Sequence, residues 1–464
     1  MILRILHKDV PLRNLLFVIG EGVLIYAAVM AAALLRFGNV HYSFLSPKII
    51  SKALLIVIVC QVSLYLNELY NFEVTDTYLE LGLRLTKAIG FASISLAVIY
   101  YCLPSLLVGR GIFFISLVFL VILVFSWRYA YNWILKKKMF TERIIVLGSG
   151  ELSQKILKEV TETRDTGCQL VGVVSTNSHS TPKLPEGMPI LNLNGNLCEF
   201  VKSNNTKKIV VAMGDKRGRL PLQELLRCKM RGITILVGET FYEKLTGKIL
   251  AENIHPSWFI YSDGFRKSRL FRLTKRTNDV VLACLGLLFS LPLTLIMALT
   301  IKLDSEGPIF YKQERCGENG RAFQLYKFRS MIHNAEAACG PIWAQDDDCR
   351  ATRVGKVIRK LRLDEIPQMW NILKGDMSFV GPRPERPEFV AELEKIVPYY
   401  SERHTVKPGI SGWAQVSYGY GASVDDALEK LRYDLFYIKN MSVFMDITII
   451  LRTIKIVLHK SGAR

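Results

Sequence analysis

The sequence predicts a membrane protein of the α plus α/β class, with an N-terminal four-helix transmembrane bundle, a Rossmann-like α/β domain and a mostly helical C-terminal domain that carries a re-entrant membrane helix. Three observations support this prediction. Four long apolar segments occupy the first third of the 464 residues, and short β-rich runs alternating with polar stretches follow them. The rest contains one more apolar run, interrupted by a proline, and then sequence rich in arginine, glycine and proline. We expect the three domains at residues 1–135, 136–265 and 266–464.

The composition combines 50% hydrophobic residues with a formal net charge of +19. A membrane protein with a basic cytoplasmic face has both properties, because lysine and arginine are retained on the inner side and attract anionic lipid head groups. Phosphorylated substrates suit the same charge. Nucleic acid is disfavoured, since the sequence has no zinc-finger spacing, basic heptad helix or aromatic RNA-binding signature. Nine cysteines without a Cys-x-x-Cys pair argue against a zinc site or a disulfide framework, and favour a reducing compartment.

The four apolar segments lie at residues 15–35, 49–66, 86–107 and 111–131. Each is close to the ~20 residues that span a bilayer as a helix. No small-residue cleavage site follows the first one promptly, so we interpret it as an uncleaved anchor. Basic residues at the two ends and between the second and third segments place both ends inside: Arg4, Lys8, Arg13, Arg84, Lys87, Lys136, Lys137 and Lys138. Arg36, Lys48 and Lys52 do not fit, because this topology puts their loop outside.

Glu21 lies within the first apolar segment. A carboxylate in a membrane helix is either functional or paired inside the bundle, and the sequence leaves both readings open.

Buried parallel strands are predicted at residues 144–147, 170–174, 209–212 and 233–237. The first runs into Gly148-Ser149-Gly150, with Ser153 where the last glycine of a dinucleotide fingerprint is expected. Ser175 and Thr176 end the second strand, so the carboxylate that would bind a ribose is missing. We therefore expect a degenerate Rossmann-like module without a working NAD site.

An apolar run at residues 280–301 is long enough to span a membrane, but Pro292 sits within it and basic sequence flanks it on both sides. Proline removes a backbone hydrogen bond, and matching basic flanks indicate that both ends lie on one side. We predict a re-entrant hairpin. The basic flank before it contains Arg266, Lys267, Arg269, Arg272, Lys275 and Arg276.

Asp364 and Glu365 stand between cationic clusters, with Lys327 and Arg329 before them, a basic stretch at residues 353–362 leading up to them, and Arg383 after them in a proline-rich loop. Judged alone, Asp364 is no more than a helix N-cap, with Glu365 favourable against the helix dipole. Guanidinium groups would keep both carboxylates ionised where phosphates also collect. This pattern suits phosphoryl transfer, with one carboxylate attacking and the next holding a metal; hard oxygen ligands favour Mg²⁺.

The motifs around this pair follow one another in a fixed order across nearly 200 residues. They are Lys275 through Asn278-Asp279, Gly307-Pro308-Ile309-Phe310, Gln313 with Arg315 and Gly317, Lys327-Phe328-Arg329-Ser330-Met331, Arg359 through Leu363-Asp364-Glu365-Ile366-Pro367-Gln368, Gly375-Asp376-Met377-Ser378, Gly381-Pro382-Arg383-Pro384-Glu385 and Lys407-Pro408-Gly409-Ile410-Ser411-Gly412-Trp413-Ala414-Gln415. In this set the chain resembles the monotopic phosphoglycosyl transferases, which are polyprenyl phosphate sugar-1-phosphate transferases with a single re-entrant membrane helix.

The domains ahead of these motifs resemble the long-chain branch of that family, with four N-terminal membrane helices and a Rossmann-like module. Residues 418–423, with Tyr433-Asp434-Leu435 after them, are similar to the subgroup associated with exosortase and exopolysaccharide loci. The family breaks its hairpin with serine directly before proline. Here Leu291 precedes Pro292 and Ser290 lies one residue earlier, so the hydroxyl's help to the freed carbonyl is in question.

The resemblance implies roles for individual residues. Asp364 matches the nucleophile that takes the phosphosugar covalently, and Glu365 its partner at the magnesium, so both are expected metal ligands. Lys327, Arg329, Arg359 and Arg383 fall on positions that bind substrate phosphates or the nucleotide.

The implied reaction transfers sugar-1-phosphate from a nucleotide sugar, with UDP expected, to undecaprenyl phosphate. It gives undecaprenyl-diphosphate-sugar and nucleoside monophosphate at the cytoplasmic face of a bacterial inner membrane, as the first membrane step of exopolysaccharide or O-antigen repeat-unit synthesis. We expect contact with membrane lipids and a homodimer formed through the bundle or the middle domain.

Three alternatives bear on this interpretation. An NAD-dependent nucleotide-sugar dehydratase or epimerase would need a complete dinucleotide fingerprint and a Tyr-x-x-x-Lys pair, and no tyrosine has that spacing. A non-catalytic scaffold for polysaccharide assembly would not need the acidic pair among cationic motifs. Residues 432–459 are too interrupted by charge to span, so they form either a helix at the head-group level or an ordinary core helix.

Overall fold

The structure is a computed structural model, which describes residues 2–5, 8–37, 47–70, 78–136, 141–162, 167–175, 190–192, 197–213, 220–253, 262, 264–265, 267–332, 350–419, 421 and 423–459. Of the positions singled out in the sequence, Lys137, Lys138, Thr176, Arg266, Tyr420 and Ala422 lie outside the described residues. The chain divides into two compact units, residues 1–245 and 246–464. The three domain boundaries expected from the sequence stay predictions.

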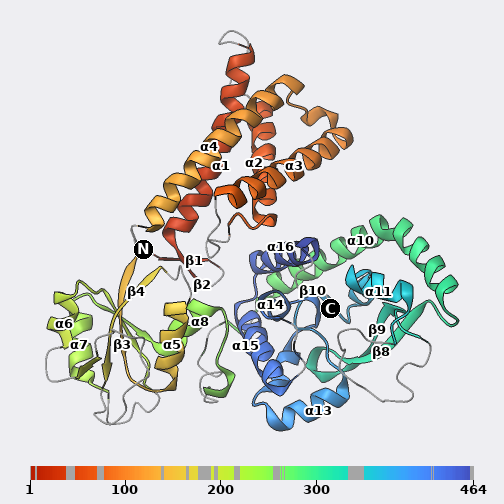
Figure 1. Cartoon of the computed structure of the whole chain (residues 1–464). Helices are drawn as coiled ribbons and strands as arrows, with labels where there is room; N and C mark the ends of the chain where they lie inside the picture. Colours follow the sequence, from red (N-terminus) through yellow and green to blue (C-terminus); the bar gives the residue numbers. More distant parts are fainter. Residues whose placement is uncertain are drawn as a thin grey trace. The chain divides into compact units, whose positions relative to one another are not determined.

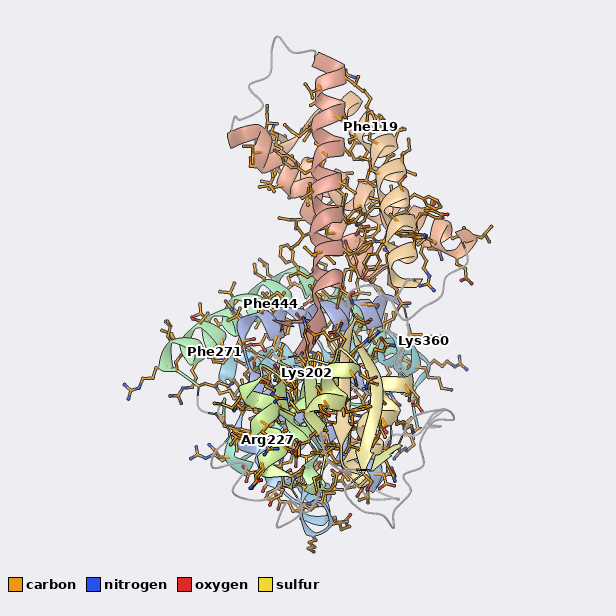
Figure 2. All side chains as sticks on the ribbon, turned by 90° about the vertical axis from the view of Figure 1, so that its left-hand side faces the viewer. Phe119, Lys202, Arg227, Phe271, Lys360 and Phe444 are labelled. Atoms are coloured by element: carbon orange, nitrogen blue, oxygen red, sulfur yellow. The ribbon has the colours of Figure 1, made fainter. Side chains whose placement is uncertain are left out.

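Four helices form the bundle of the first unit, after a short antiparallel pair of strands, β1 (Ile2–Ile5) and β2 (Lys8–Pro11) (Figure 1). They are α1 (Leu12–Phe37), α2 (Pro47–Leu66), α3 (Tyr78–Cys102) and α4 (Arg110–Lys136). Each is long and apolar enough to cross a membrane, judged by length and composition. Figure 2 shows how densely side chains project from these helices, and exposed ones such as Ile19, Ile58, Ile94 and Phe114 are apolar. Such a surface is suited to lipid rather than water.

The third predicted segment was wrong at both ends. Helix α3 begins at Tyr78 and stops at Cys102, before a 3₁₀ turn at Pro104–Leu106. The residue before a proline is disfavoured in the helical region, and Leu103 is non-helical with φ −131° and ψ 74°. Arg84 and Lys87 consequently lie inside the helix and not in a loop before it.

Glu21 is fully buried in the bundle and pairs with Arg128 of α4, whose Nη2 lies 2.7 Å from the Glu21 Oε1. The Nη1 of Arg128 donates to the Leu69 carbonyl at 2.6 Å. One buried guanidinium therefore ties α1, α4 and the turn that follows α2 together. The structure thus supports the interpretation in which Glu21 pairs within the bundle.

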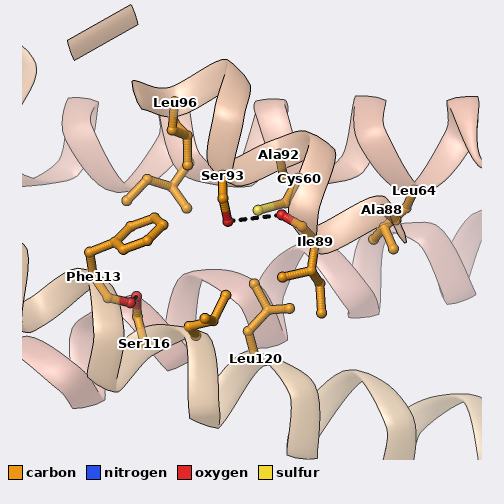
Figure 3. A pocket seen from close by; sticks show the side chains of 12 residues that line it. Cys60, Leu64, Ala88, Ile89, Ala92, Ser93, Leu96, Phe113, Ser116 and Leu120 are labelled. Atoms are coloured by element: carbon orange, nitrogen blue, oxygen red, sulfur yellow. Dashed lines mark hydrogen bonds between the residues drawn. The ribbon is translucent and has the colours of Figure 1, made fainter. Parts of the chain in front are cut away.

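An apolar hollow lies between α2, α3 and α4, lined by side chains including Cys60, Leu96 and Phe113 (Figure 3). Its two hydroxyl groups serve their own helices: Ser93 donates to the Ile89 carbonyl at 2.9 Å and Ser116 to the Phe113 carbonyl at 2.9 Å. The hollow therefore presents mainly hydrocarbon.

A five-stranded parallel sheet forms the α/β part of the first unit, in the order β5-β4-β3-β6-β7. This is the doubly wound Rossmann order. Its strands are β3 (Glu142–Leu147), β4 (Cys168–Ser175), β5 (Ile190–Asn192), β6 (Lys208–Val211) and β7 (Thr234–Val237). Its helices are α5 (Glu151–Glu162), α6 (Leu197–Ser203), α7 (Leu222–Met230) and α8 (Gly238–Thr246), visible around the sheet in Figure 1.

The Rossmann-like prediction is confirmed, and all four predicted strands are present. The fifth, β5, was missed because three residues are too short to show a periodicity. At the end of β3, Gly148 has φ +123°, and a Cβ there would lie 2.6 Å from the Ala212 carbonyl oxygen. Only glycine fits this turn without strain.

The second unit is mostly helical, as predicted. Its helices are α10 (Arg269–Asp304), α11 (Arg353–Lys360), α12 (Gln368–Lys374), α13 (Pro387–Ile396), α14 (Trp413–Ser417), α15 (Val424–Asn440) and α16 (Val443–His459). Antiparallel strands β8 (Phe310–Cys316) and β9 (Ala322–Phe328) form a hairpin, and β10 (Ser378–Val380) pairs in parallel with β11 (Gly409–Ser411).

Helix α10 is one 36-residue helix that stays helical through Pro292. Figure 1 shows it changing direction along its length, so the expected break is a bend within one helix. Proline at position 292 leaves the Leu288 carbonyl without its helical donor. Ser290 does not replace it, because its hydroxyl donates to the Leu287 carbonyl at 3.3 Å. Whether both ends lie on one side of a membrane stays a prediction.

Candidate active site

The acidic pair lies on a 3₁₀ turn, Leu363–Glu365, between α11 and α12. The turn is anchored by Leu363 and Ile366, which pack against a buried cluster that includes Phe328 and Ile358. Asp364 is not the N-cap of the following helix, because Pro367 occupies that position and offers no side-chain cap. The N-cap reading of Asp364 is therefore wrong.

Arg362, directly before this turn, has φ +54°, in the left-handed region. This conformation is uncommon for a residue with a side chain, and such strain clusters at functional sites. The predicted site did not include Arg362, since no sequence pattern reports a left-handed arginine. Its charge acts on the site, as the pKa of Glu365 shows.

Two cations from distant segments converge on Glu365. Arg383 donates through Nη2 to its Oε1 at 3.0 Å, and the Lys327 Nζ lies 3.8 Å from the same oxygen. Burial alone would raise the pKa of Glu365, but Arg383, Lys327 and Arg362 outweigh it and lower that pKa to about 2. Burial lowers the pKa of Lys327, with Glu365 opposing the shift. Glu365 is therefore the ionised counter-charge of this cluster.

Asp364 is in a different state from its neighbour. Burial raises its pKa above the ordinary value, and the negative charge of Glu365 adds to the effect, while Lys327 and Arg383 oppose it. Among the described residues, no cation lies within ion-pair distance of Asp364. The expectation that guanidinium groups hold both carboxylates ionised alike is thus corrected, because the cations are directed to Glu365. Asp364 is left as the more basic carboxylate.

The loop that carries Arg383 is fixed by close backbone contacts. Gly381 donates to the Ser411 carbonyl at 2.9 Å, and Gly409 donates to the Pro382 carbonyl at 2.9 Å. A Cβ on Gly381 would lie 2.3 Å from the Lys407 carbonyl oxygen, so the approach requires glycine. This packing explains the Gly-Pro-Arg-Pro and Lys-Pro-Gly motifs together, since they meet across β10 and β11.

The other two predicted binding residues differ. Arg329 is buried, with 5% of its surface exposed, and donates to the Glu306 carbonyl at 2.9 Å and to the Ser305 carbonyl at 2.7 Å. Its guanidinium holds the segment that follows α10, so its described contacts are structural. Arg359, half-buried on α11, has no ion-pair partner among the described residues and remains available to an anion.

A half-buried arginine, Arg315, supports the site and was not among the predicted residues. Its Nη1 donates to the Pro384 carbonyl at 3.1 Å, next to Arg383. Burial lowers its pKa, and Glu385 opposes this. In the sequence, Arg315 belongs to one of the motifs but lies far along the chain from the acidic pair, so its role at the site could not be predicted from its position.

The predicted magnesium ligands are Asp364 and Glu365. No group of three or more histidine, cysteine or acidic side chains that could hold a metal occurs in the described part of the chain. Two neighbouring carboxylates nevertheless fit Mg²⁺, which is usually held by one or two carboxylates together with substrate phosphates and water. Arg383 and Lys327 both contact the Oε1 atom of Glu365, and neither of these two contacts involves its Oε2 atom.

Comparison with known proteins assigns both units. The profile of a family described as bacterial sugar transferase matches residues 270–460, and that of a CoA-binding domain matches residues 66–219. The chain is 44% identical over 240 residues to a UDP-N-acetylgalactosamine-undecaprenyl-phosphate N-acetylgalactosaminephosphotransferase of Aeromonas hydrophila, covering 52% of this chain and 56% of the relative. The chain thus spans little more than half the length of that relative.

Two further relatives match over a larger share. A UDP-glucose:undecaprenyl-phosphate glucose-1-phosphate transferase of Xanthomonas campestris pv. campestris is 33% identical over 328 residues, which cover 69% of this chain and 68% of the relative. A UDP-galactose-lipid carrier transferase of Erwinia amylovora is 30% identical over 346 residues, covering 71% and 70%. With this coverage of both chains, and with the acidic pair inside the residues that the family profile matches, the protein belongs to the bacterial sugar transferase family.

Proposed function

We propose that this protein transfers sugar-1-phosphate from a UDP-sugar to undecaprenyl phosphate through a covalent aspartyl-phosphosugar intermediate. The observation that carries the proposal is the difference within the acidic pair. Arg383 and Lys327 pair with Glu365, whereas Asp364 has no ion-pair partner among the described residues and its pKa is raised. The names of the three relatives support the substrate classes, since two act on undecaprenyl phosphate with a UDP-sugar and the third on a UDP-sugar and a lipid carrier.

In the first step, a carboxylate oxygen of Asp364 attacks the sugar-proximal phosphorus. The bond from that phosphorus to the oxygen bridging the two phosphates breaks, and UMP leaves with the electron pair. In the second step, a phosphate oxygen of undecaprenyl phosphate attacks the same phosphorus, and the acyl-phosphate bond breaks to regenerate the Asp364 carboxylate. Splitting one transfer into two displacements lets the two large substrates use one site in turn.

The cations around the pair offset charge that builds on the phosphate oxygens. Arg383 and Lys327 already converge on Glu365 and can bind the diphosphate without a large rearrangement. Mg²⁺, held by Asp364 and Glu365, would neutralise the leaving diphosphate oxygens when bound. Arg359 is available to the phosphate of the lipid acceptor.

The proposed setting is the cytoplasmic face of a bacterial inner membrane. Helix α10 is long and apolar enough to cross a membrane, and many of its side chains, including Leu288, Phe289 and Leu299, are exposed. The unit that carries the acidic pair is therefore suited to sit where a prenyl tail stays in lipid while its phosphate reaches Asp364. We propose the first membrane step of exopolysaccharide or O-antigen synthesis as the process served, and a homodimer as the assembly.

The test uses purified full-length protein with undecaprenyl phosphate and a panel of radiolabelled UDP-sugars. Wild-type protein should release UMP and, without the lipid acceptor, retain labelled sugar covalently. Asp364→Asn should abolish both, because an amide cannot attack the phosphorus. Asp425→Asn, at an exposed acid on α15, is the matched control and should leave both unchanged. Normal turnover by Asp364→Asn would rule out the assigned nucleophile.

A further inference from the structure

A buried ion pair lies behind the loop that carries Arg383. Arg403 and Asp434 are 4% and 1% exposed, and the Arg403 Nη2 lies 2.9 Å from the Asp434 Oδ2. Arg403 also donates through Nη1 to the Tyr400 hydroxyl at 2.6 Å, and its guanidinium lies 5.1 Å from the centre of the Tyr400 ring. The pair joins α15 to the 3₁₀ turn Tyr400–Thr405, and neither charge belongs to the proposed chemistry.

The same guanidinium reaches the site through the backbone. Arg403 Nη2 donates to the Arg383 carbonyl at 3.0 Å. It is one of four donors that hold four successive carbonyls of this loop: Pro382 accepts from the Gly409 N–H at 2.9 Å, Arg383 from Arg403, Pro384 from Arg315 at 3.1 Å, and Glu385 from the Cys316 N–H at 2.9 Å. The backbone of Arg383 is therefore held from behind while its side chain reaches Glu365.

Stability alone does not explain such a pair. Removing two charges from water is expensive, and a buried ion pair is often no more stabilising than apolar side chains of the same volume. Burial raises the pKa of Asp434 to about 6, with Arg403 opposing the shift, which shows how poorly solvated this carboxylate is. Asp434 supplies the counter-charge of Arg403. Without it, an unpaired positive charge would be buried beneath the loop, at a large cost in desolvation free energy.

We propose that Arg403 and Asp434 are positioning residues, which fix the backbone of Arg383 so that its guanidinium meets Glu365 and the diphosphate in one geometry. A continuous path of contacts supports it: Asp434 to Arg403 at 2.9 Å, Arg403 to the Arg383 carbonyl at 3.0 Å, and Arg383 to Glu365 at 3.0 Å. The inference rests on the proposed function, because it assigns Arg383 to the transferred phosphate.

A double-mutant cycle in the full-length protein tests this inference, with UMP release as the activity and thermal unfolding as a separate readout. Asp434→Asn keeps the shape of the side chain and should lower kcat by about 10- to 100-fold, with a smaller change in KM. In an Arg383→Ala background the same change should lower kcat by less than about 2-fold, because the group that it positions is gone. An equal loss in both backgrounds would overturn the inference.

Glu252→Gln is the matched control. Glu252 pairs at 2.5 Å with Arg432, a residue of the same helix α15, and neither residue is among the four donors that hold the carbonyls of the Arg383 loop. Any loss that it causes should be the same with and without the Arg383 side chain.

Arg403→Lys keeps a positive charge near Asp434 but replaces the planar guanidinium with a single ammonium group. That group cannot reproduce the arrangement in which Nη1 bonds Tyr400 while Nη2 meets both Asp434 and the Arg383 carbonyl. It should unfold close to the wild-type temperature and still lose about 10-fold in kcat. A folded Arg403→Lys with wild-type kcat would overturn the inference even if Asp434→Asn fails to fold. Wild-type protein that releases no UMP from any UDP-sugar would instead count against the proposed function.

Discussion

Two arginines of this protein, Arg383 and Arg329, have the same side chain but different roles. Arg383 contacts Glu365 at the acidic pair, whereas Arg329 is buried and bonded to backbone carbonyls after α10. Both occupy motif positions next to other cations in the sequence. Burial separates them, because the guanidinium of Arg329 is 5% exposed and its Nη atoms donate to backbone carbonyls, so it is not open to a substrate phosphate.

The unequal carboxyls predict a pH dependence for the first step. Burial raises the pKa of Asp364 above its ordinary value, so this group stays protonated to a higher pH than an ordinary aspartate. Attack requires the carboxylate, so single-turnover UMP release should increase as pH rises through this raised pKa, while Glu365, with a pKa of about 2, stays ionised throughout. Single-turnover rates of UMP release measured from about pH 4 to about pH 8 would locate the acid limb, which is the pH range over which the rate falls as Asp364 becomes protonated.

Glu365→Gln provides the matching test of the cause. The negative charge of Glu365 helps to raise the pKa of Asp364, and Lys327 and Arg383 would remain after the substitution. The acid limb of the remaining activity should therefore move to lower pH. An acid limb that does not move would contradict the electrostatic coupling between the two carboxyls.

At the scale of elements, α10 combines a long apolar surface with a proline inside the same helix. Its apolar residues are suited to lipid, and Pro292 removes a backbone donor within them. The helix nevertheless remains continuous, because the loss of one hydrogen bond bends a helix without separating it into two. Arg276 secures its first turns by donating to the Ile372 and Leu373 carbonyls at 2.6 and 2.9 Å.

The hairpin hypothesis predicts that both ends of α10 lie on the cytoplasmic side. In a background without native cysteines, Arg269→Cys and Glu306→Cys place single thiols at exposed positions near the two ends. A membrane-impermeant thiol reagent should label neither in intact spheroplasts and both in inverted vesicles. Labelling of one position from each side would show that α10 crosses the membrane.

Residues 432–459, interpreted from the sequence as one helix, are divided between the end of α15 and α16, which begins at Val443. Met445 and Ile449 are fully buried, whereas Phe444, labelled in Figure 2, and Ile447 are 57% and 49% exposed. One face thus belongs to the core of the unit and the other is apolar and exposed. The core reading is borne out for the first face, and the head-group reading stays a prediction for the second.

At the scale of the whole molecule, the described residues of the proposed chemistry all lie in the second unit, from Lys327 to Arg383. A UDP-glucose:undecaprenyl-phosphate glucose-1-phosphate transferase of Caulobacter vibrioides is 39% identical over 193 residues, which are 41% of this chain but 72% of that relative. The matched stretch is thus less than half of this chain but the greater part of that relative.

A fragment of residues 246–464 should therefore release UMP in detergent with the same dependence on Asp364 as the full chain. Its internal contacts include the Lys275–Asp446 pair at 2.7 Å, which ties α10 to α16 within the unit. We expect its kcat to be within about 10-fold of the full-length value, since no described contact of the acidic pair is removed. A folded fragment without activity would show that the first unit contributes to the reaction.

The sequence by itself determined the membrane helices, four of the five strands of the sheet and the acidic pair with its cationic motifs. These features depend on the length, periodicity and chemistry of residues close together in the chain. Tertiary structure decided which cation meets which acid: Arg383 reaches Glu365 from 18 residues away, and Arg403 reaches the Arg383 carbonyl from 20. The tertiary structure also buries Asp364, which raises its pKa, and places Arg329 where it bonds backbone carbonyls. Burial and pairing depend on contacts between distant segments, which no local sequence pattern reports.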